Sequence, residues 1–357
     1  MKRNYYIFTP GKLSRKDNTI FFVPFTDPDP QDDENLQNEI LLSVDSDSPE
    51  IDPENKKVMP VSDIDSFYLM AEATFNTKFT EFCSKHNIPI HLFNRYGYYS
   101  GSFYPREHLN SGFLTVNQTK HYLRKEKRLA LAKNFVDGAA FNLIRNLKYY
   151  NNRGCDLDAQ IDTMDSILPE IDAAGDIQHL MNAEGRIRKI YYTAFEFILL
   201  EEFKFGKRSH RPPSNPINAL ISFCNALVYT SCLSEIYMTQ LNPTVSFLHE
   251  PGQRRFSLAL DISEIFKPIL SDRIIFKLVN NKIIKIDDFE PKLNGTYLKE
   301  KGRKKVIQEF DQKLKTTIKH RQIKRDVSYK RLIRLECYKI IKHLTGDKNY
   351  EPFKIWW

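Results

Sequence analysis

The hydrophobic pattern of this chain changes its period near Gln118. Before that point, short runs rich in aromatic and β-branched residues, such as NTIFFVPF and PIHLF, are separated by Pro, Gly and Asn, which is typical of strands. After it, apolar residues recur about every 3.6 positions, as in amphipathic helices. The sequence therefore predicts an α+β fold: a small sandwich-like β-domain over 1–104, a linker over 105–117 and a larger all-α domain over 118–357.

The same reading predicts individual elements. In the first part, residues 66–86 allow one helix, although the run SFYLM at its start could instead extend as a strand. In the second part, Asn215 can cap a helix whose first position suits Pro216. The other expected helices span residues 119–150, 157–172, 176–204, 303–319 and 327–345.

Charge is distributed unevenly along the 357 residues, whose net charge is +8. Residues 27–54 contain eleven acids and neither lysine nor arginine, which predicts a flexible acidic insertion near 27–55. Residues 299–342 hold sixteen lysines or arginines against five acids. A polyanionic partner such as nucleic acid explains this basic excess, and a solvated basic face with no partner is the alternative.

The sequence contains no run of 18 apolar residues, and its first residues lack the pattern of a secretory signal. Its five cysteines include no CxxC pair, so they predict reduced thiols rather than a disulfide framework or a zinc ribbon. We therefore expect a cytoplasmic protein that does not enter a membrane.

One carboxylate lies where an apolar side chain is expected. In the helix predicted over 176–204, the apolar stripe runs through Met181 and Ile187, and Glu184 falls midway between them. A carboxylate on such a face loses hydration unless a cation or hydrogen bonds compensate it. Glu184 is therefore a candidate site residue; a buried Glu–Arg pair or a rotated helix would also explain it.

The segment HEPGQRRFSLALDISEIFKP, residues 249–268, supplies further candidates. Asp261 and Glu264 share a face if the segment is helical, and both then need a partner. A capping box, with Asp261 as N-cap, is the structural alternative. His249 is a candidate imidazole ligand or an ordinary structural histidine.

One histidine with two or three carboxylates is a nitrogen and oxygen ligand set that suits Mg²⁺ or Mn²⁺ and phosphodiester chemistry. Such chemistry needs cationic side chains to hold phosphate, although each available arginine could equally be an ordinary surface residue. The candidates are Arg186, Arg188, Arg208, Arg211, Arg254 and Arg255.

Several motifs occur in a family-like order along almost the whole chain. They are RYGYYSGSFYPRE, LMNAEGRIRKIYY around Glu184, RPPSNPINALISFCN, FLHEPGQRRFSLALDISEIFKP, LNGTYLKEKGRKKVIQEF and SYKRLIRLECYKIIKHL. In this order and spacing the chain resembles the CRISPR-associated adaptation endonuclease and integrase Cas-one, particularly the branch that accompanies type I-B systems.

The resemblance implies a role in antiviral defence. It matches Glu184, His249 and Glu264 to the divalent-metal ligands and Asp261 to a further acid beside them. It implies a homodimer formed chiefly through the β-domain, assembly with a dimer of Cas-two, and insertion of prespacer DNA into a CRISPR repeat by attack of a 3′-hydroxyl. Residues 136–142, VDGAAFN, lack the lysine that many relatives carry there.

Two other functions stay open at this point. A noncatalytic nucleic-acid-binding scaffold would use the basic helices, with the aromatic residues between 93 and 104 as a stacking platform. Alternating aromatic residues in strands are more often core or dimer interface, which is the favoured interpretation of these residues. A nuclease acting on RNA would use the same ligands as one acting on DNA, because nothing in the sequence reports recognition of a 2′-hydroxyl.

Overall fold

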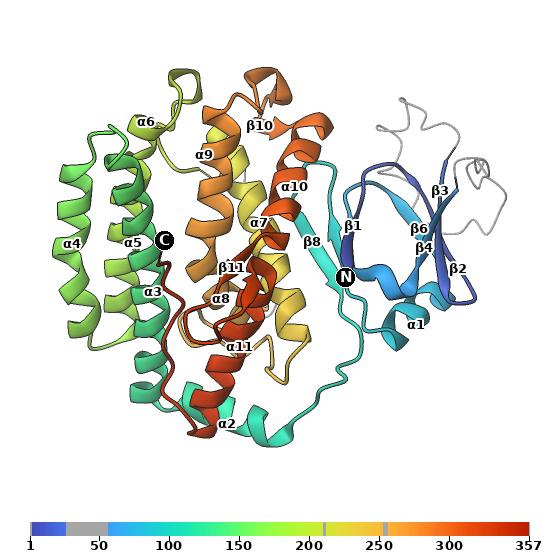
Figure 1. Ribbon diagram of the computed structural model, residues 1–357, viewed down its shortest axis with the longest axis horizontal. Helices are drawn as coiled ribbons and strands as arrows, with labels where there is room; N and C mark the ends of the chain where they lie inside the picture. Colours follow the sequence, from blue (N-terminus) through green and yellow to red (C-terminus); the bar gives the residue numbers. More distant parts are fainter. Residues whose placement is uncertain (1, 26–55, 210–211, 253–255, 357) are drawn as a thin grey trace. The chain divides into compact units, whose positions relative to one another are not determined.

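The computed structural model describes residues 2–25, 56–209, 212–252 and 256–356. It separates into two compact units, Met1–His108 and Leu109–Trp357. Strands dominate the first unit and helices the second, which confirms the predicted α+β class (Figure 1). The acidic insertion expected near 27–55 lies outside the described residues.

The first unit contains two four-stranded sheets, ordered β1-β5-β7-β8 and β4-β3-β2-β6. Both contribute to one apolar core, which includes Leu13 and Ile20 of the second sheet and Phe67 and Ile90 of the first. The elements are β1 (Arg3–Ile7), β2 (Gly11–Lys16), β3 (Thr19–Pro24), β4 (Lys57–Pro60), β5 (Ile64–Leu69), β6 (Ala73–Phe75), α1 (Thr77–Lys85), β7 (Ile90–Phe93) and β8 (Tyr99–Phe103).

The residues between 66 and 86 divide into extended and helical parts. SFYL belongs to β5, whose parallel pairing with β1 and β7 buries it at the centre of its sheet. The helix α1 begins only at Thr77, where the Asn76 side chain accepts a hydrogen bond from the backbone N–H of Phe79. The aromatic and apolar residues of the first half favour a central strand.

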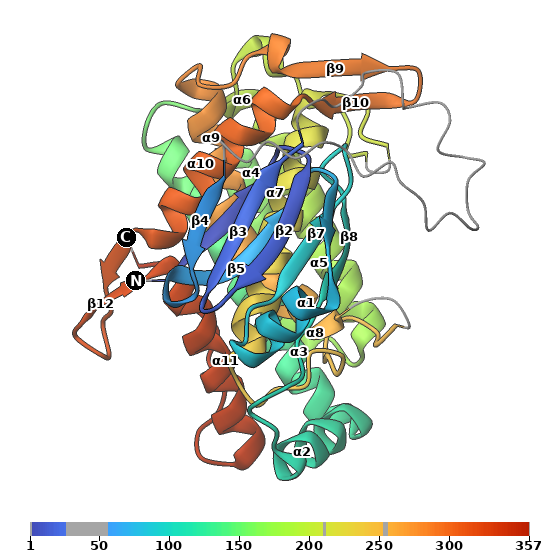
Figure 2. The same ribbon diagram turned by 90° about the vertical axis from the view of Figure 1, so that its right-hand side faces the viewer.

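The second unit is built mainly of helices (Figures 1 and 2). Its elements are α2 (Gly112–Leu123), α3 (Lys125–Asn151), α4 (Asp158–Ala173), α5 (Ile177–Thr193), α6 (Phe195–Ile198), η2 (Glu201–Phe203), α7 (Pro216–Tyr237), α8 (Ser257–Lys267), η3 (Pro268–Asp272), α9 (Arg273–Asn280), η4 (Ile286–Asp288), β9 (Phe289–Lys292), β10 (Gly295–Leu298), α10 (Glu300–Lys315), β11 (Thr317–Lys319), β12 (Asp326–Ser328) and α11 (Tyr329–Thr345).

Three expected helices differ from the observed ones. The range 119–150 holds two helices, because the backbone of Arg124 is extended between α2 and α3. The first of these begins at Gly112, inside the expected linker, where the Ser111 hydroxyl accepts a hydrogen bond from Leu114 N–H. The range 176–204 breaks after Thr193, and the end of 303–319 is strand β11, paired with β12. Periodicity does not reveal such breaks within an apolar stripe.

The central helix of this unit is α7, which starts where its sequence predicts. The side chain of Asn215 accepts a hydrogen bond from Asn218 N–H at 2.9 Å, and Pro216 occupies the first turn. Its most apolar 18-residue window has a mean hydropathy of 1.4, so the helix is long and apolar enough for a membrane span, yet 83% of that window is buried inside the protein. Its apolar character is that of a core helix.

Helix α8 continues through η3 into α9, and the C-terminal segment packs across α3. Gly138 of α3 is required there, because a Cβ atom at this position would lie 2.5 Å from Cβ of Pro352. The buried Asn142 side chain donates to the backbone carbonyls of Ile265 and Phe353 and accepts from Ile355 N–H. These contacts fix α8 and the C-terminal segment against one helix.

Candidate active site

Glu184 lies at the edge of the buried face of α5. That face is formed by Leu180, Ala183, Ile187 and Tyr191, and the Glu184 side chain is 17% exposed. The structure therefore places this carboxylate at the margin of the core, where it is partly desolvated but still accessible. A compensating cation is present one turn further along the same helix.

The compensating cation is Arg188, which joins two acids from different helices. It donates to Oε1 of Glu184 through Nε at 2.7 Å and through Nη2 at 2.6 Å. The same guanidinium makes an ion pair with Oε2 of Glu264 in α8. Arg188 was a candidate phosphate contact from the sequence; in this structure it is the shared counter-ion of two site carboxylates.

Glu264 is compensated by cations on both of its carboxylate oxygens. Lys267, one turn along α8, donates to its Oε1 at 2.5 Å, while Arg188 binds the other oxygen. Burial alone would raise the pKa of Glu264, but Arg188, Lys267 and His249 together lower that pKa to about 2. Glu264 is therefore ionised at neutral pH and forms ion pairs with Arg188 and Lys267.

Asp261 lies well inside α8 and is fully buried, so the capping-box interpretation is wrong. Its Oδ2 accepts hydrogen bonds from the backbone N–H groups of Phe247 and Leu248, at 2.6 and 3.0 Å. Its Oδ1 accepts from His249 N–H at 3.0 Å and contacts Nδ1 of the same residue at 2.9 Å. Asp261 thus shapes the loop before α8 and orients the imidazole.

The hydrogen bond to Asp261 assigns the tautomer of His249. A carboxylate can only accept, so Nδ1 donates and the neutral imidazole keeps its lone pair on Nε2. Burial opposes protonation, but the hydrogen bond and charge of Asp261, with help from Glu264, raise the pKa of His249 above its ordinary value. The loop is also held from α3, where Arg128 donates to Phe247 O at 2.9 Å and pairs with Glu250 at 2.7 Å.

These contacts bring the three predicted metal ligands into one neighbourhood. Glu184 and Glu264 share Arg188, and the charges of Glu264 and His249 shift each other's pKa. Within the described ranges, no three carboxylate, imidazole or thiol groups already stand as a ready metal cluster. The donor chemistry fits a hard divalent cation, which would replace Arg188 and Lys267 as the partner of ionised carboxylates.

The other predicted arginines differ in their surroundings. Arg186 is exposed and pairs with Glu170 of α4 at 2.6 Å. Arg208 is held by α7, donating to Asn218 Oδ1 at 2.9 Å and to Ser222 Oγ at 3.3 Å. Arg211, Arg254 and Arg255 lie outside the described residues.

Sequence reasoning missed a second layer of buried polar groups behind the cluster. Asp272 of η3 is buried, and burial raises its pKa to about 7, against the opposing effects of Tyr191, Arg188 and Lys267. Tyr191 donates to Asp272, and its neighbour Tyr192 hydrogen-bonds Arg188. The only local signal is the position of Asp272 between the apolar residues 269–270 and 274–276, and this position indicates burial only once the path of the helix is known.

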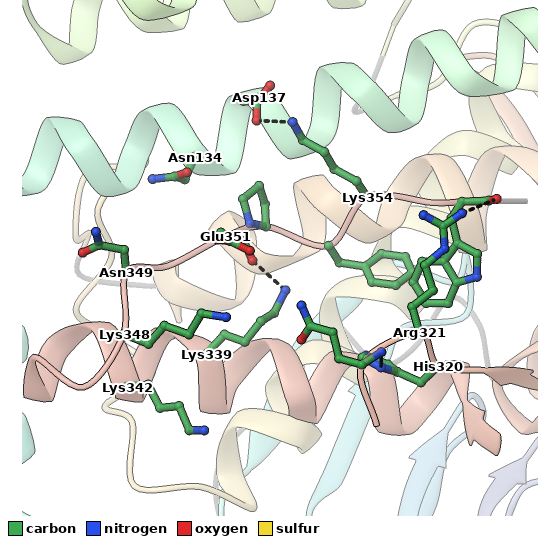
Figure 3. A pocket seen from close by; sticks show the side chains of 14 residues that line it. Asn134, Asp137, His320, Arg321, Lys339, Lys342, Lys348, Asn349, Glu351 and Lys354 are labelled. Atoms are coloured by element: carbon green, nitrogen blue, oxygen red, sulfur yellow. Dashed lines mark hydrogen bonds and ion pairs between the residues drawn. The ribbon is translucent and has the colours of Figure 1, made fainter. Parts of the chain in front are cut away.

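Sequence reasoning also missed a basic pocket of about 540 Å³ between α3, α11 and the C-terminal segment (Figure 3). Lys354 reaches Asp137 of α3 at 2.7 Å, and Lys339 donates to the backbone carbonyl of Glu351 at 2.7 Å. Lys342 and Lys348 also line it, and neither pairs with a carboxylate among the described residues. Phe353, at the pocket wall, stacks on Phe266 of α8, next to the Glu264 region.

The helical unit of this α+β architecture gathers two glutamates, an Asp–His pair and cationic side chains in one half-buried cluster, which is a set of groups that suits the class of enzymes acting on phosphodiesters. The chain belongs to the family described as CRISPR associated protein Cas1, which matches residues 5–312. This is the family called Cas-one in the sequence analysis, and the assignment confirms the resemblance at the level of the family; the type I-B branch stays a prediction.

Curated relatives share almost the full length. A protein of Thermodesulfovibrio yellowstonii described as CRISPR-associated endonuclease Cas1 3 is 49% identical over 99% of this chain and 100% of its own length. A CRISPR-associated endonuclease Cas1 of Fusobacterium nucleatum is 46% identical over 100% of this chain and 98% of its own. These names agree with the class of enzyme that the groups of the cluster suit.

Solved structures share the fold. A CAS1 protein from Thermotoga maritima superposes with a TM-score of 0.83 at 35% identity, covering 98% of this chain and 100% of that one. At 18% identity, a casposase bound to integration product has a TM-score of 0.81 and covers 99% of this chain and 93% of its own. At 16%, a Cas6-RT-Cas1–Cas2 complex has a TM-score of 0.80 and covers 100% of this chain and 36% of its own.

Proposed function

We propose that this Cas1 protein is a divalent-metal-dependent DNA endonuclease and integrase, in which Glu184, His249 and Glu264 hold Mg²⁺ or Mn²⁺. The observation that carries the proposal is the pairing of Glu184 and Glu264, from separate helices, through one guanidinium. Two desolvated carboxylates that already bind a shared cation provide the charge that a metal ion requires. A bound divalent ion would neutralise charge on the scissile phosphate and stabilise the leaving oxygen.

The residues of the chain have distinct parts in this proposal. Asp261 keeps Nδ1 of His249 protonated, so Nε2 is the nitrogen offered to a ligand. Arg188 and Lys267, once released from the carboxylates, become cations beside an anionic substrate. In integration, the prespacer 3′-hydroxyl oxygen would form a bond to the phosphorus of the repeat backbone, and the bond from that phosphorus to the 3′-oxygen of the cut strand would break. The attacking hydroxyl would lose its proton to water and the leaving 3′-oxygen would gain one, so the number of phosphodiester bonds is unchanged.

The basic pocket of Figure 3 is the surface that we propose holds DNA phosphates outside the cluster. Lys342 and Lys348 line the pocket and form no ion pair with a carboxylate in the described ranges. Phe353, also in the lining, stacks on Phe266 of α8. Phosphate neutralisation by such lysines is independent of sequence and dependent on salt.

We further propose the assembly and setting that the family resemblance implies: a homodimer formed through the first unit, binding to a Cas2 dimer, membership of the type I-B branch, and work in the cytoplasm on prespacer DNA and the CRISPR repeat. The complex of a related chain with Cas2 and the casposase with its integration product support the Cas2 and DNA partners.

The test separates catalysis from binding. Glu184→Gln and His249→Gln should lower Mn²⁺-dependent cleavage of a branched DNA substrate at least a hundredfold, with DNA affinity changed less than threefold, because phosphate contacts come from other residues. Glu170→Gln is the matched control, since that exposed acid also pairs with an arginine. Cleavage at the parental rate by both site variants would refute the assignment of catalysis to these residues, whereas a parent protein that binds DNA without Mn²⁺-dependent cleavage would favour the noncatalytic scaffold.

The same assay distinguishes DNA from RNA. Parallel substrates of identical sequence, one DNA and one RNA, should show cleavage and strand joining with DNA only. Faster metal-dependent cleavage of the RNA substrate would favour the RNA nuclease instead.

A further inference from the structure

A second, smaller pocket of about 210 Å³ lies between α9 and α10. It shares no lining residue with the carboxylate cluster or with the basic pocket of Figure 3. Its lining consists of Arg273, Ile274, Lys277, Glu309, Gln312, Lys313 and Thr316. Three of these side chains are cationic and one is anionic.

Arg273 is a half-buried cation. Among the residues that the structure describes, no carboxylate forms an ion pair with it. Its Nε donates to the neutral amide oxygen of Asn146 at 2.7 Å, and its guanidinium lies 5.9 Å from the ring centroid of Tyr149. Burial lowers the pKa of Arg273, although nearby tyrosines oppose that effect. Neither an amide nor a neutral ring supplies the negative charge that usually accompanies a desolvated guanidinium.

Lys313 repeats the pattern on the facing helix. Its Nζ lies 4.3 Å from the ring centroid of Tyr329, and in the described parts of the chain it makes no ion pair. Burial, together with the positive charges of Arg273 and Lys277, lowers the pKa of Lys313 to about 8. The three cations are therefore close enough to repel one another.

The local acids do not offset this charge. Glu309 is paired with Lys277 at 2.5 Å, and Asp311 with the exposed Lys315, also at 2.5 Å. The C-terminal end of α10 attracts cations, but its partial charge is about half an elementary charge and is shared with Lys315. Arg273 is not stabilised by the partial negative charge of a helix C-terminus, because it lies where η3 continues directly into α9. A net excess of two positive charges remains in the pocket.

We propose that this pocket binds a phosphate-type oxyanion, either free phosphate or a phosphate of a nucleic-acid backbone. A tetrahedral oxyanion offers acceptors to Arg273 and Lys313 at once, and the side-chain amide of Gln312 lies in the same lining as a neutral donor. The Thr316 hydroxyl already donates to Gln312 O at 3.0 Å. The site is separate from the metal site and does not depend on the proposed function.

The first experiment uses inorganic phosphate as the probe, with the full-length protein in EDTA so that no metal binds. Isothermal titration calorimetry should show one phosphate per chain, with the affinity reduced at least tenfold in Lys313→Met and in Arg273→Gln. Lys315→Met, two residues along the same helix, is the matched control and should bind as the parent does. Lys313→Arg should retain binding, which separates loss of charge from loss of fold; circular dichroism confirms folding of each variant.

The second experiment identifies the source of the phosphate. A short DNA duplex should displace inorganic phosphate if the backbone occupies the pocket, and Lys313→Met should then reduce the salt dependence of duplex binding by about one counterion. Phosphate binding that duplex leaves unchanged would assign a free anion instead. Glu184→Gln should bind phosphate as the parent does, so failure of the metal site leaves this result intact. If phosphate and duplex binding are both unchanged in Lys313→Met and Arg273→Gln, the proposal is overturned.

Discussion

Nδ1 of His249 lies 2.9 Å from Oδ1 of Asp261, and the same carboxylate accepts three backbone hydrogen bonds from residues 247–249. One buried side chain therefore sets both the path of the loop and the tautomer of the imidazole. In the function proposed above, Asp261 acts through His249 as a positioning residue, and this would explain why it groups with the predicted ligands without direct coordination.

Asp261→Asn should disturb this arrangement, because the amide places an NH₂ group among groups that are all donors. We expect unfolding free energy to fall by about 2–4 kcal/mol and the Mn²⁺ concentration needed for half-maximal cleavage to rise about tenfold or more. Chemical denaturation and a Mn²⁺ titration measure the two effects. Asp165→Asn, an exposed acid paired with Lys148, is the control and should change neither. An unchanged Mn²⁺ requirement would exclude a positioning role.

Arg188→Gln should leave two partly desolvated carboxylates without their shared cation. In EDTA we expect a loss of about 2–4 kcal/mol of stability, since one partner of a largely buried ion pair is removed. Mn²⁺ should restore more stability to this variant than it adds to the parent, because the ion supplies the missing charge. Arg186→Gln provides the exposed control. Equal unfolding midpoints for Arg188→Gln and the parent in EDTA would argue against the counter-ion role.

Asp272 predicts a pH dependence of stability. Its pKa rises from 3.8 in the unfolded chain to about 7 in the folded one, chiefly by burial, so the folded state holds an extra proton between those values. Stability from this group is therefore greatest at low pH and is lost as pH rises from about 4 to 7, by roughly 4 kcal/mol in total.

Asp272→Asn removes that titration while keeping an acceptor for Tyr191. The variant-minus-parent difference in unfolding free energy should increase from pH 4 to pH 7 and then level off, measured by denaturation in EDTA. A difference that is independent of pH would show that Asp272 is ionised in the folded state throughout.

Lys342→Met combined with Lys348→Met should weaken duplex DNA binding and reduce its salt dependence by about two counterions. The reason is that both lysines line the basic pocket without a described carboxylate partner. Fluorescence anisotropy at several salt concentrations provides the slope. Lys78→Met, on an exposed position of α1, is the control. A slope equal to that of the parent would remove this pocket from the DNA surface.

The sequence by itself determined the α+β class, the start of α7 and the identity of the candidate acids, because periodicity, capping residues and a carboxylate in an apolar stripe are local signals. It could not reveal the helix break at Arg124, which local periodicity does not mark. Glu184 and Glu264 are 80 positions apart, and only tertiary packing of α5 against the rest of the helical unit decided that one arginine joins them. Tertiary packing also decided that Asp261 is a buried orienting group, that Asp272 lies behind the cluster and that Arg273 faces Lys313, since desolvation and charge pairing depend on neighbours that are distant in the chain.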